Sequence, residues 1–168
     1  LELVNDLLDV ARIEAGKFEI FPEPHDPKGA LDEAVGFYQT AAQDAQLALG
    51  VKTSTLPAAI PFDRSRILQV LSNLISNALK FTPAGGSVEI QGLAHQKGQD
   101  ILAEAARAGI EWFVDPASRN WKEMSDSIVF AVTDSCIGLS STQLGQLFNK
   151  FKQFKETAQS AQKGTGLG

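Results

Sequence analysis

The chain has 168 residues, of which 43% are hydrophobic and 21% charged, as is typical of a soluble globular protein with one sizeable core. Its formal net charge of −5 argues against nucleic acid as a partner, and its single cysteine, Cys136, cannot form an internal disulfide. No apolar run is long enough to span a membrane and no signal peptide is visible, although both ends look like those of a fragment.

The N-terminal third predicts two helices and two strands. Residues 1–15 carry apolar side chains at intervals of three or four, as in the seam of a coiled coil, and Gly16 is expected to end this helix. Asp26 is expected to cap a second helix that runs from about Pro27 to Leu47. Strands are expected at residues 18–21 and 51–56.

The most informative segment is RILQVLSNLISNALKFTP, residues 66–83, a predicted helix that Asp63 is expected to cap. One broad apolar face should pack on a sheet: Ile67, Val70, Leu71, Leu74, Ile75 and Ala78. Three serines form a back that suits solvent: Ser65, Ser72 and Ser76. A polar shoulder lies between the two: Arg66, Gln69, Asn73, Asn77 and Lys80.

That shoulder has two interpretations. From the amphipathic pattern alone, a polar flank that is merely solvated is favoured. A helix that lines a nucleotide pocket would also use such side chains, because an amide oxygen can ligate Mg²⁺ and a lysine can meet a phosphate. The motifs further along the chain decide between the two.

The second half predicts two more strands and a helix around an unusual insert. Strands are expected at residues 87–93 and 127–133, the latter nearly all apolar and therefore central in its sheet. Residues 93–126 form the insert, in which Gln99 to Ala108 is helix-prone, and packing on its own domain is favoured over a partner surface. Alternating helices and strands predict an α/β fold, a mixed sheet covered by helices on one face.

Ser140 or Ser141 should cap a helix to about Lys150, and the polar residues 152–163 should be mobile. Three motifs belong to this region: DSCIGLS at 134–140, LFNKF at 147–151 and GTGLG at 164–168. With the 66–83 helix, and in this order, they resemble the asparagine box, first glycine box, phenylalanine box and second glycine box of the ATP-binding domain of sensor histidine kinases. Residues 1–16 resemble the end of that family's dimerisation helix, and residues 17–168 its catalytic domain, cut after the second glycine box.

The resemblance implies the Bergerat-type ATP-binding fold, a two-layer α/β sandwich, with ATP between the helix layer and a lid at residues 152–163. It implies ATP and Mg²⁺ as cofactors, with Asn77 and Asn73 at the metal, Lys80 at a phosphate, Phe81 near the base or ribose, and Asp134 at the adenine amino group. Further contacts are implied for the two glycine boxes and the phenylalanine box: Gly138, Phe148, Phe151, Gly164, Gly166 and Gly168.

Two positions, Asn73 and Cys136, differ from the residues that the resemblance or related ATPases lead one to expect. Related ATPases carry a glutamate where this chain has Asn73, and an amide cannot act as a base, so ATP should be bound and donated and not rapidly hydrolysed. Cys136 stands where the resemblance leads one to expect a glycine, and a side chain there would crowd the nucleotide or strain the backbone. The alternative function is therefore a degenerate regulatory interaction module that binds nucleotide poorly.

Neither His25 nor His95 resembles the family's phosphoacceptor site, so no catalytic residue is expected within the chain, and it should not autophosphorylate alone. The resemblance places the acceptor histidine upstream of Leu1 and implies a response regulator or receiver domain as partner, with homodimerisation through upstream helices. No nucleic acid or membrane contact is expected. The resemblance implies a cytoplasmic domain and leaves open whether a longer protein is membrane-anchored.

Overall fold

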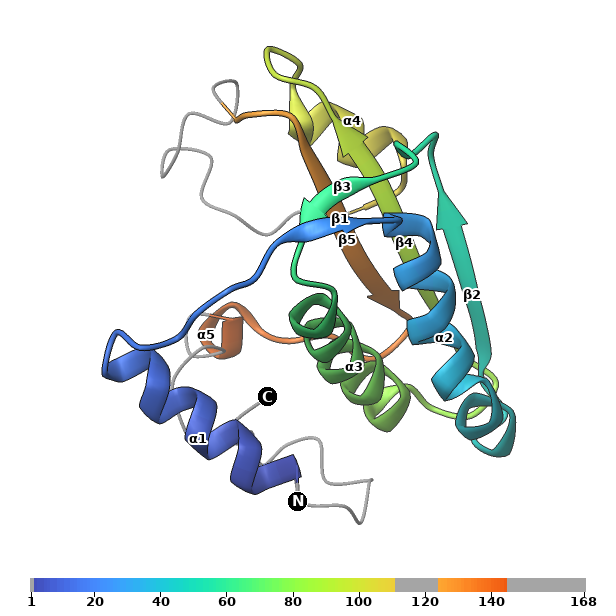
Figure 1. Cartoon of the computed structure of the whole chain (residues 1–168). Coiled ribbons are helices and arrows are strands. Elements are labelled where there is room, and N and C mark those ends of the chain that lie inside the picture. The colour runs from blue at the N-terminus through green and yellow to red at the C-terminus, as the bar shows by residue number, and fades with distance from the viewer. Residues whose placement is uncertain (1, 111–123, 145–168) are drawn as a thin grey trace.

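The computed structural model of the chain describes residues 2–110 and 124–144. Helices and strands alternate along most of this length (Figure 1). In chain order they are α1 (Glu2–Glu14), β1 (Glu23–His25), α2 (Pro27–Asp44), β2 (Ala48–Thr53), β3 (Ile60–Phe62), α3 (Arg64–Phe81), β4 (Ser87–His95), α4 (Ile101–Arg107), β5 (Ser127–Asp134) and α5 (Ser141–Leu144).

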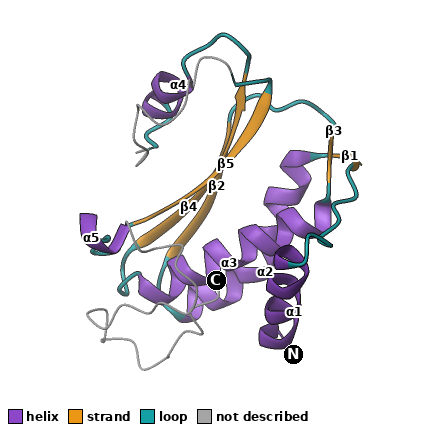
Figure 2. Cartoon of the chain, turned by 90° about the vertical axis from the view of Figure 1, so that its left-hand side faces the viewer, coloured by secondary structure: helices purple, strands orange, loops and turns teal. Residues whose placement is uncertain are grey.

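A mixed three-stranded sheet forms the centre of the fold, in the order β2-β4-β5. β2 runs parallel to β4, with Ala48 opposite Ser87, and β5 runs antiparallel to β4, with Asp134 opposite Val88. α2 and α3 cover one face of this sheet (Figure 2). The predicted α/β fold class, with a mixed sheet under a helix layer, is confirmed.

The core lies between these two helices and β4. Its members are Leu31, Ala34 and Val35 of α2, Leu71, Ile75 and Ala78 of α3, and Val88 and Ile90 of β4. The alternation of β4 also turns Gly92 toward the helices, where an added Cβ would lie 2.7 Å from Leu31 Cδ1. A glycine therefore lets α2 approach the sheet closely at this position.

Two details of the predicted packing are wrong. β5 was expected to be central because it is apolar, but in the described sheet β4 is central and β5 lies at the edge. Its Phe130 and Val132 instead pack on the helix layer. Val70 and Leu74 were expected in the core but are 53% and 44% exposed, because α3 buries a narrower line through Leu71, Ile75 and Ala78.

The N-terminal strand is also displaced from its predicted place. Residues 18–21 form no strand; β1 begins at Glu23 and pairs with β3, a short strand that the sequence did not reveal. The alternating pattern of residues 18–21 does not mark a strand here. The Phe21 N–H donates instead to Asp63 Oδ2 at the start of α3, at 3.1 Å. The strand predicted at residues 51–56 lies at Ala48–Thr53.

The predicted residues cap the starts of α2 and α3, and a glycine follows α1 as predicted. Asp26 Oδ1 accepts the Lys28 N–H at 2.9 Å at the start of α2, and Asp63 Oδ1 accepts the Arg66 N–H at 3.2 Å at the start of α3. Gly16, just after α1, has φ +65, a conformation that glycine adopts without a Cβ clash.

The first part of the insert packs on its own domain, as favoured above. Asp100 Oδ1 caps α4 by accepting the Leu102 N–H at 3.0 Å, and Ile101 and Ala105 are fully buried. α4 lies on the side of the sheet opposite to α2 and α3 (Figure 2). The insert thus adds cover to the face that the predicted two-layer fold left open. Its large apolar residues Trp112, Phe113 and Trp121 lie outside the described residues.

Candidate functional site

The outer surface of α3 presents the polar stripe that the sequence singled out. Asn73 and Asn77 lie one turn apart, and both are exposed. Within the described parts of the chain, no residue forms a hydrogen bond with either side-chain amide. The exposed apolar side chains of Val70 and Leu74 lie on the same helix between this stripe and the core. As far as the chain is described, the surface of α3 therefore offers amide groups without protein partners next to exposed apolar area.

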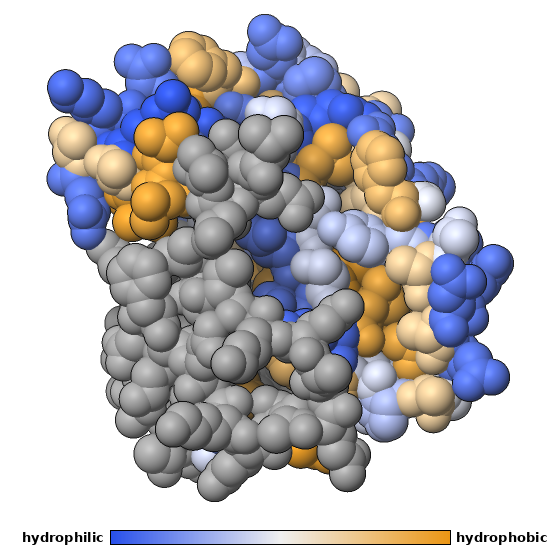
Figure 3. All heavy atoms as spheres, turned by 90° about the horizontal axis from the view of Figure 1, so that it is seen from below, coloured by the Kyte–Doolittle hydropathy of each residue, from blue (hydrophilic) through white to orange (hydrophobic). Residues whose placement is uncertain are grey.

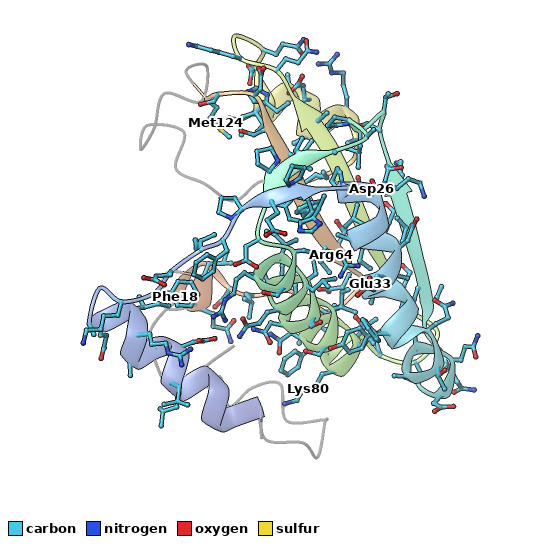
Figure 4. All side chains as sticks on the ribbon, in the orientation of Figure 1. Phe18, Asp26, Glu33, Arg64, Lys80 and Met124 are labelled. Atoms are coloured by element: carbon cyan, nitrogen blue, oxygen red, sulfur yellow. The ribbon has the colours of Figure 1, made fainter. Side chains whose placement is uncertain are left out.

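Lys80 and Phe81 end the same helix, and Figure 4 shows Lys80 at the C-terminal end of α3. Lys80 Nζ lies 5.2 Å from the centroid of the Phe81 ring, which is 40% exposed. No carboxylate among the described residues forms an ion pair with Lys80. Its charge is thus available to an anion beside an exposed aromatic ring.

Asp134 ends β5 close to this end of α3. Gly86 lies between the two: a Cβ built on it would be 2.5 Å from Thr82 Cγ2 and 2.6 Å from Ser135 Oγ. Ser135 in turn donates its N–H to the Ser87 carbonyl at 3.1 Å and accepts the Ser87 N–H on Oγ at 2.9 Å. We call Thr82, Gly86 and Ser135 the junction, because they hold the end of β5 against the end of α3.

The loop after Asp134 is organised by the residue that departs from the family pattern. Cys136 donates its N–H to Asp134 Oδ1 at 2.9 Å, and Cys136 Sγ accepts the Gly138 N–H at 3.3 Å. Gly138 has φ +72, whereas the only non-glycine with positive φ among the described residues is Gln46. The backbone at Cys136 therefore does not require glycine, and the expected backbone strain is absent. Only the steric part of the concern about Cys136 remains.

The thiol of Cys136 is not activated. Partial burial, and then its hydrogen bond with Asp134, raise the pKa of this thiol above its usual range. A protonated thiol is a poor nucleophile and a poor metal ligand, so Cys136 acts here as a small side chain that shapes the loop.

The remaining site residues of the sequence prediction cannot be placed. Phe148, Phe151 and the glycines of the second glycine box, with residues 152–163, lie outside the described residues. The helix before them does begin as predicted: Ser140 Oγ accepts the Gln143 N–H at 3.3 Å, and Gln143 Oε1 accepts the Ser140 N–H at 2.7 Å. This reciprocal pair is a capping box at the start of α5.

Both histidines have structural contacts away from this surface. The His25 ring packs edge-on against Phe62, with ring centroids 5.4 Å apart, and the buried His95 pairs through Nδ1 with Glu104 Oε2 at 2.7 Å. Two concave surfaces lined by described residues also lie elsewhere, one beside β2 and β4 and one at the N-terminal end of α3. Neither includes Asn73, Asn77, Lys80 or Asp134.

The described residues contain no group of three or more His, Cys, Asp or Glu side chains that could hold a metal ion. The donor set of the stripe is instead neutral amide oxygen. This fits Mg²⁺, which is commonly bound by few protein oxygens together with nucleotide phosphates and water. No helix in the described portion of the chain is long and apolar enough to cross a membrane.

Comparison with known proteins defines the class. Residues 62–168 match the family described as "Histidine kinase-, DNA gyrase B-, and HSP90-like ATPase", and the chain belongs to this family. Curated relatives are 34% identical (Non-motile and phage-resistance protein, Caulobacter vibrioides), 31% identical (circadian input-output histidine kinase CikA, Synechococcus elongatus) and 30% identical (histidine protein kinase DivJ, Caulobacter vibrioides), each over 100% of this chain. The chain spans only 17%, 19% and 23% of their respective lengths.

Two solved structures share the fold of this chain. ShkA full-length in complex with AMPPNP superposes with a TM-score of 0.68 at 26% identity, over 90% of this chain and 27% of that one. The catalytic domain of histidine kinase ThkA, at 18% identity, shares the fold with a TM-score of 0.59 over 89% of this chain and 76% of that one. Within the family, the chain is an ATP-binding domain of the sensor histidine kinase type.

Proposed function

We propose that this domain binds Mg-ATP along the stripe of α3 and donates the γ-phosphoryl group to a histidine on a dimerisation helix outside this sequence. The observation that carries the proposal is the pair of exposed amides of Asn73 and Asn77, which have no hydrogen-bond partner among the described residues, with Lys80, which forms no ion pair among them, on the same helix. Residues 1–16 are then the end of the dimerisation helix and residues 17–168 the catalytic domain, with 93–126 as its insert and 152–163 as its lid.

In this assignment the amide oxygens of Asn77 and Asn73 would ligate Mg²⁺, and Lys80 would contact a phosphate. The bound ion would neutralise phosphate charge, which is what phosphoryl transfer most needs from a site. Phe81 packs beside the base or ribose. Asp134 would accept a hydrogen bond from the adenine amino group; its carboxylate already accepts one from the Cys136 N–H but has further lone pairs to offer. The glycine boxes and phenylalanine box complete the site through Gly138, Phe148, Phe151, Gly164, Gly166 and Gly168.

The same residues explain why the domain donates phosphate to a protein and not to water. The side chain of Asn73 is an amide, which cannot take a proton from an attacking water molecule. His25 and His95 both have structural contacts, which supports the expectation that this chain alone does not autophosphorylate. The phosphorylated histidine would then supply a response regulator or receiver domain, and the complete kinase would act as a homodimer.

A second function follows from Cys136, whose side chain stands where the family pattern has no Cβ. If that side chain blocks the base, the domain is a regulatory interaction module that binds little nucleotide. The absence of backbone strain at Cys136 favours the first proposal.

Calorimetric titration with ATP, with and without Mg²⁺, separates the two functions. The wild-type chain is expected to bind Mg-ATP, and Asn77→Ala to lose about tenfold or more in affinity, which corresponds to roughly 1.4 kcal/mol. Ser76→Ala is the matched control, because its exposed hydroxyl bonds, among the described residues, only to the Asn73 carbonyl of the same helix. Equal affinity of wild type and Asn77→Ala would remove Asn77 from the site, and no binding by wild type would favour the interaction module.

A further inference from the structure

The contact between α1 and the rest of the domain is a closed polar triangle. Arg66 Nη1 donates to Asp9 Oδ2 at 2.8 Å and to Gln69 Oε1 at 2.9 Å, and Gln69 Nε2 donates to Asp9 Oδ2 at 3.1 Å. Each member bonds to both others, and the Asp9 side chain is only 15% exposed. The Asp9 carboxylate is largely covered and accepts hydrogen bonds from two side chains of α3. Its contact with α3 is therefore specific.

Arg66 is fixed from a second direction. Its guanidinium carbon lies 4.6 Å from the centroid of the Phe18 ring, in the segment that leads away from α1. Figure 4 shows Phe18 in that segment, between α1 and α3. A planar guanidinium can stack on an aromatic ring and bond to a carboxylate at the same time, which a lysine cannot match. Arg66 thus connects α1, the following segment and α3.

Several apolar side chains described at this contact are not buried. Leu7, Leu8 and Ile13 of α1 are 52%, 49% and 59% exposed, and Val70 and Leu74 of α3 are 53% and 44% exposed. Seen from below, apolar patches also remain open on the described surface (Figure 3). Among its described side chains, α1 is thus held mainly by charges and hydrogen bonds, and such a contact can be released at low cost and is sensitive to salt.

We propose that Asp9, Arg66 and Gln69 form a latch that holds α1 against α3 and opens as a unit. Arg66 and Gln69 precede Asn73 on the same stripe, about 10 Å and 6 Å along the helix axis at 1.5 Å per residue. The consequence rests on the proposed function: if α1 continues the helix that carries the phosphoacceptor, the closed latch sets where the nucleotide stripe lies relative to the acceptor. Asp9, Arg66 and Gln69 are then positioning residues of phosphoryl transfer.

The latch can be tested on the whole chain by a distance measurement between spin labels. Labels are attached at Ala11→Cys in α1 and Ser76→Cys in α3, both exposed positions, in a Cys136→Ser background. The labelled chain with Asp9, Arg66 and Gln69 unaltered should give one narrow distance distribution at low salt, and this distribution should broaden in 1 M salt. Arg66→Gln and Asp9→Asn should each broaden it, and the double variant should be no broader than either, because the residues act as one unit.

Two further variants keep the test decisive. Reversing both charges, with Asp9→Arg and Arg66→Asp together, should restore a narrow distribution that either reversal alone abolishes, which excludes a mere folding defect. Arg12→Gln is the control, because Arg12 approaches Asp9 at 3.6 Å from within α1 and makes no bridge to α3. An unchanged distribution in Arg66→Gln, or equal broadening in Arg12→Gln, would overturn the latch. Calorimetry on the unaltered chain tests ATP binding separately, so failure of the latch and failure of the proposed function are distinguishable.

Discussion

Gly86→Ala is the substitution that tests most directly whether the junction holds Asp134 against α3. An added methyl would lie 2.5 Å from Thr82 Cγ2, 2.6 Å from Ser135 Oγ and 2.9 Å from the Pro83 carbonyl oxygen. All three distances are below van der Waals contact. Because one of them involves a backbone atom, the surrounding side chains and backbone must shift to make room for the methyl group. Overpacking of this kind costs about 1–3 kcal/mol of unfolding free energy. Because the loop at Ser135 adjoins Asp134, we also expect weaker ATP binding.

Urea unfolding followed by circular dichroism measures the first effect, and calorimetry with Mg-ATP the second. Gly36→Ala is the control: Gly36 lies inside α2 with nothing within 4 Å of its Cβ position, so alanine there should stabilise the helix by roughly 0.5–1 kcal/mol. Adding Thr82→Ser to Gly86→Ala removes the methyl in closest contact and should recover part of the lost stability. If Gly86→Ala unfolds at the same urea concentration as wild type, the junction is not as tight as the distances indicate.

Three further outcomes are expected. Cys136→Gly should raise ATP affinity or leave it unchanged in calorimetry, because it removes a side chain beside Asp134; a marked loss would show that Cys136 contacts the nucleotide or that the loop needs the bond from the Gly138 N–H to its Sγ. Hydrogen bonding from Gln69, and then the charges of Arg66 and Arg12, lower the pKa of Asp9, so the docking of α1 should be complete at neutral pH and be lost only as pH falls through that lowered value; spin-label distances that broaden already between pH 7 and 5 would contradict this. Incubation with labelled ATP should leave His25 and His95 unlabelled and release phosphate slowly, whereas rapid hydrolysis would place the protein among the ATPases.

Local chemistry made part of this structure readable from the sequence. Asp26, Asp63 and Ser140 could be predicted as caps because a side-chain oxygen just before a helix accepts hydrogen bonds from the free backbone N–H groups of the first turn. The fold class followed from the order of elements and from the resemblance. The amides of Asn73 and Asn77 could be assigned to one helix surface because periodicity fixes their direction.

Features that depend on contacts between distant segments could not be predicted. An apolar strand such as β5 can be central or lie at an edge under a helix, and composition does not separate the two. Val70 and Leu74 fit the apolar face of α3 by periodicity, but only the packed sheet decides how wide the buried line is. Asp9 and Arg66 look like ordinary surface charges, since nothing local indicates that residues 57 positions apart meet.

The most direct test of the central claim is to observe the side-chain amides of Asn73 and Asn77 while Mg-ATP is added. In nuclear magnetic resonance spectra of the nitrogen-labelled chain, the side-chain NH₂ signals of both residues should shift on addition of Mg-ATP, and by less with ATP alone. The side-chain signal of Gln39, exposed on α2, should stay in place. If Mg-ATP binds and the signals of Asn73 and Asn77 do not move, the nucleotide lies elsewhere and the stripe of α3 is not its site.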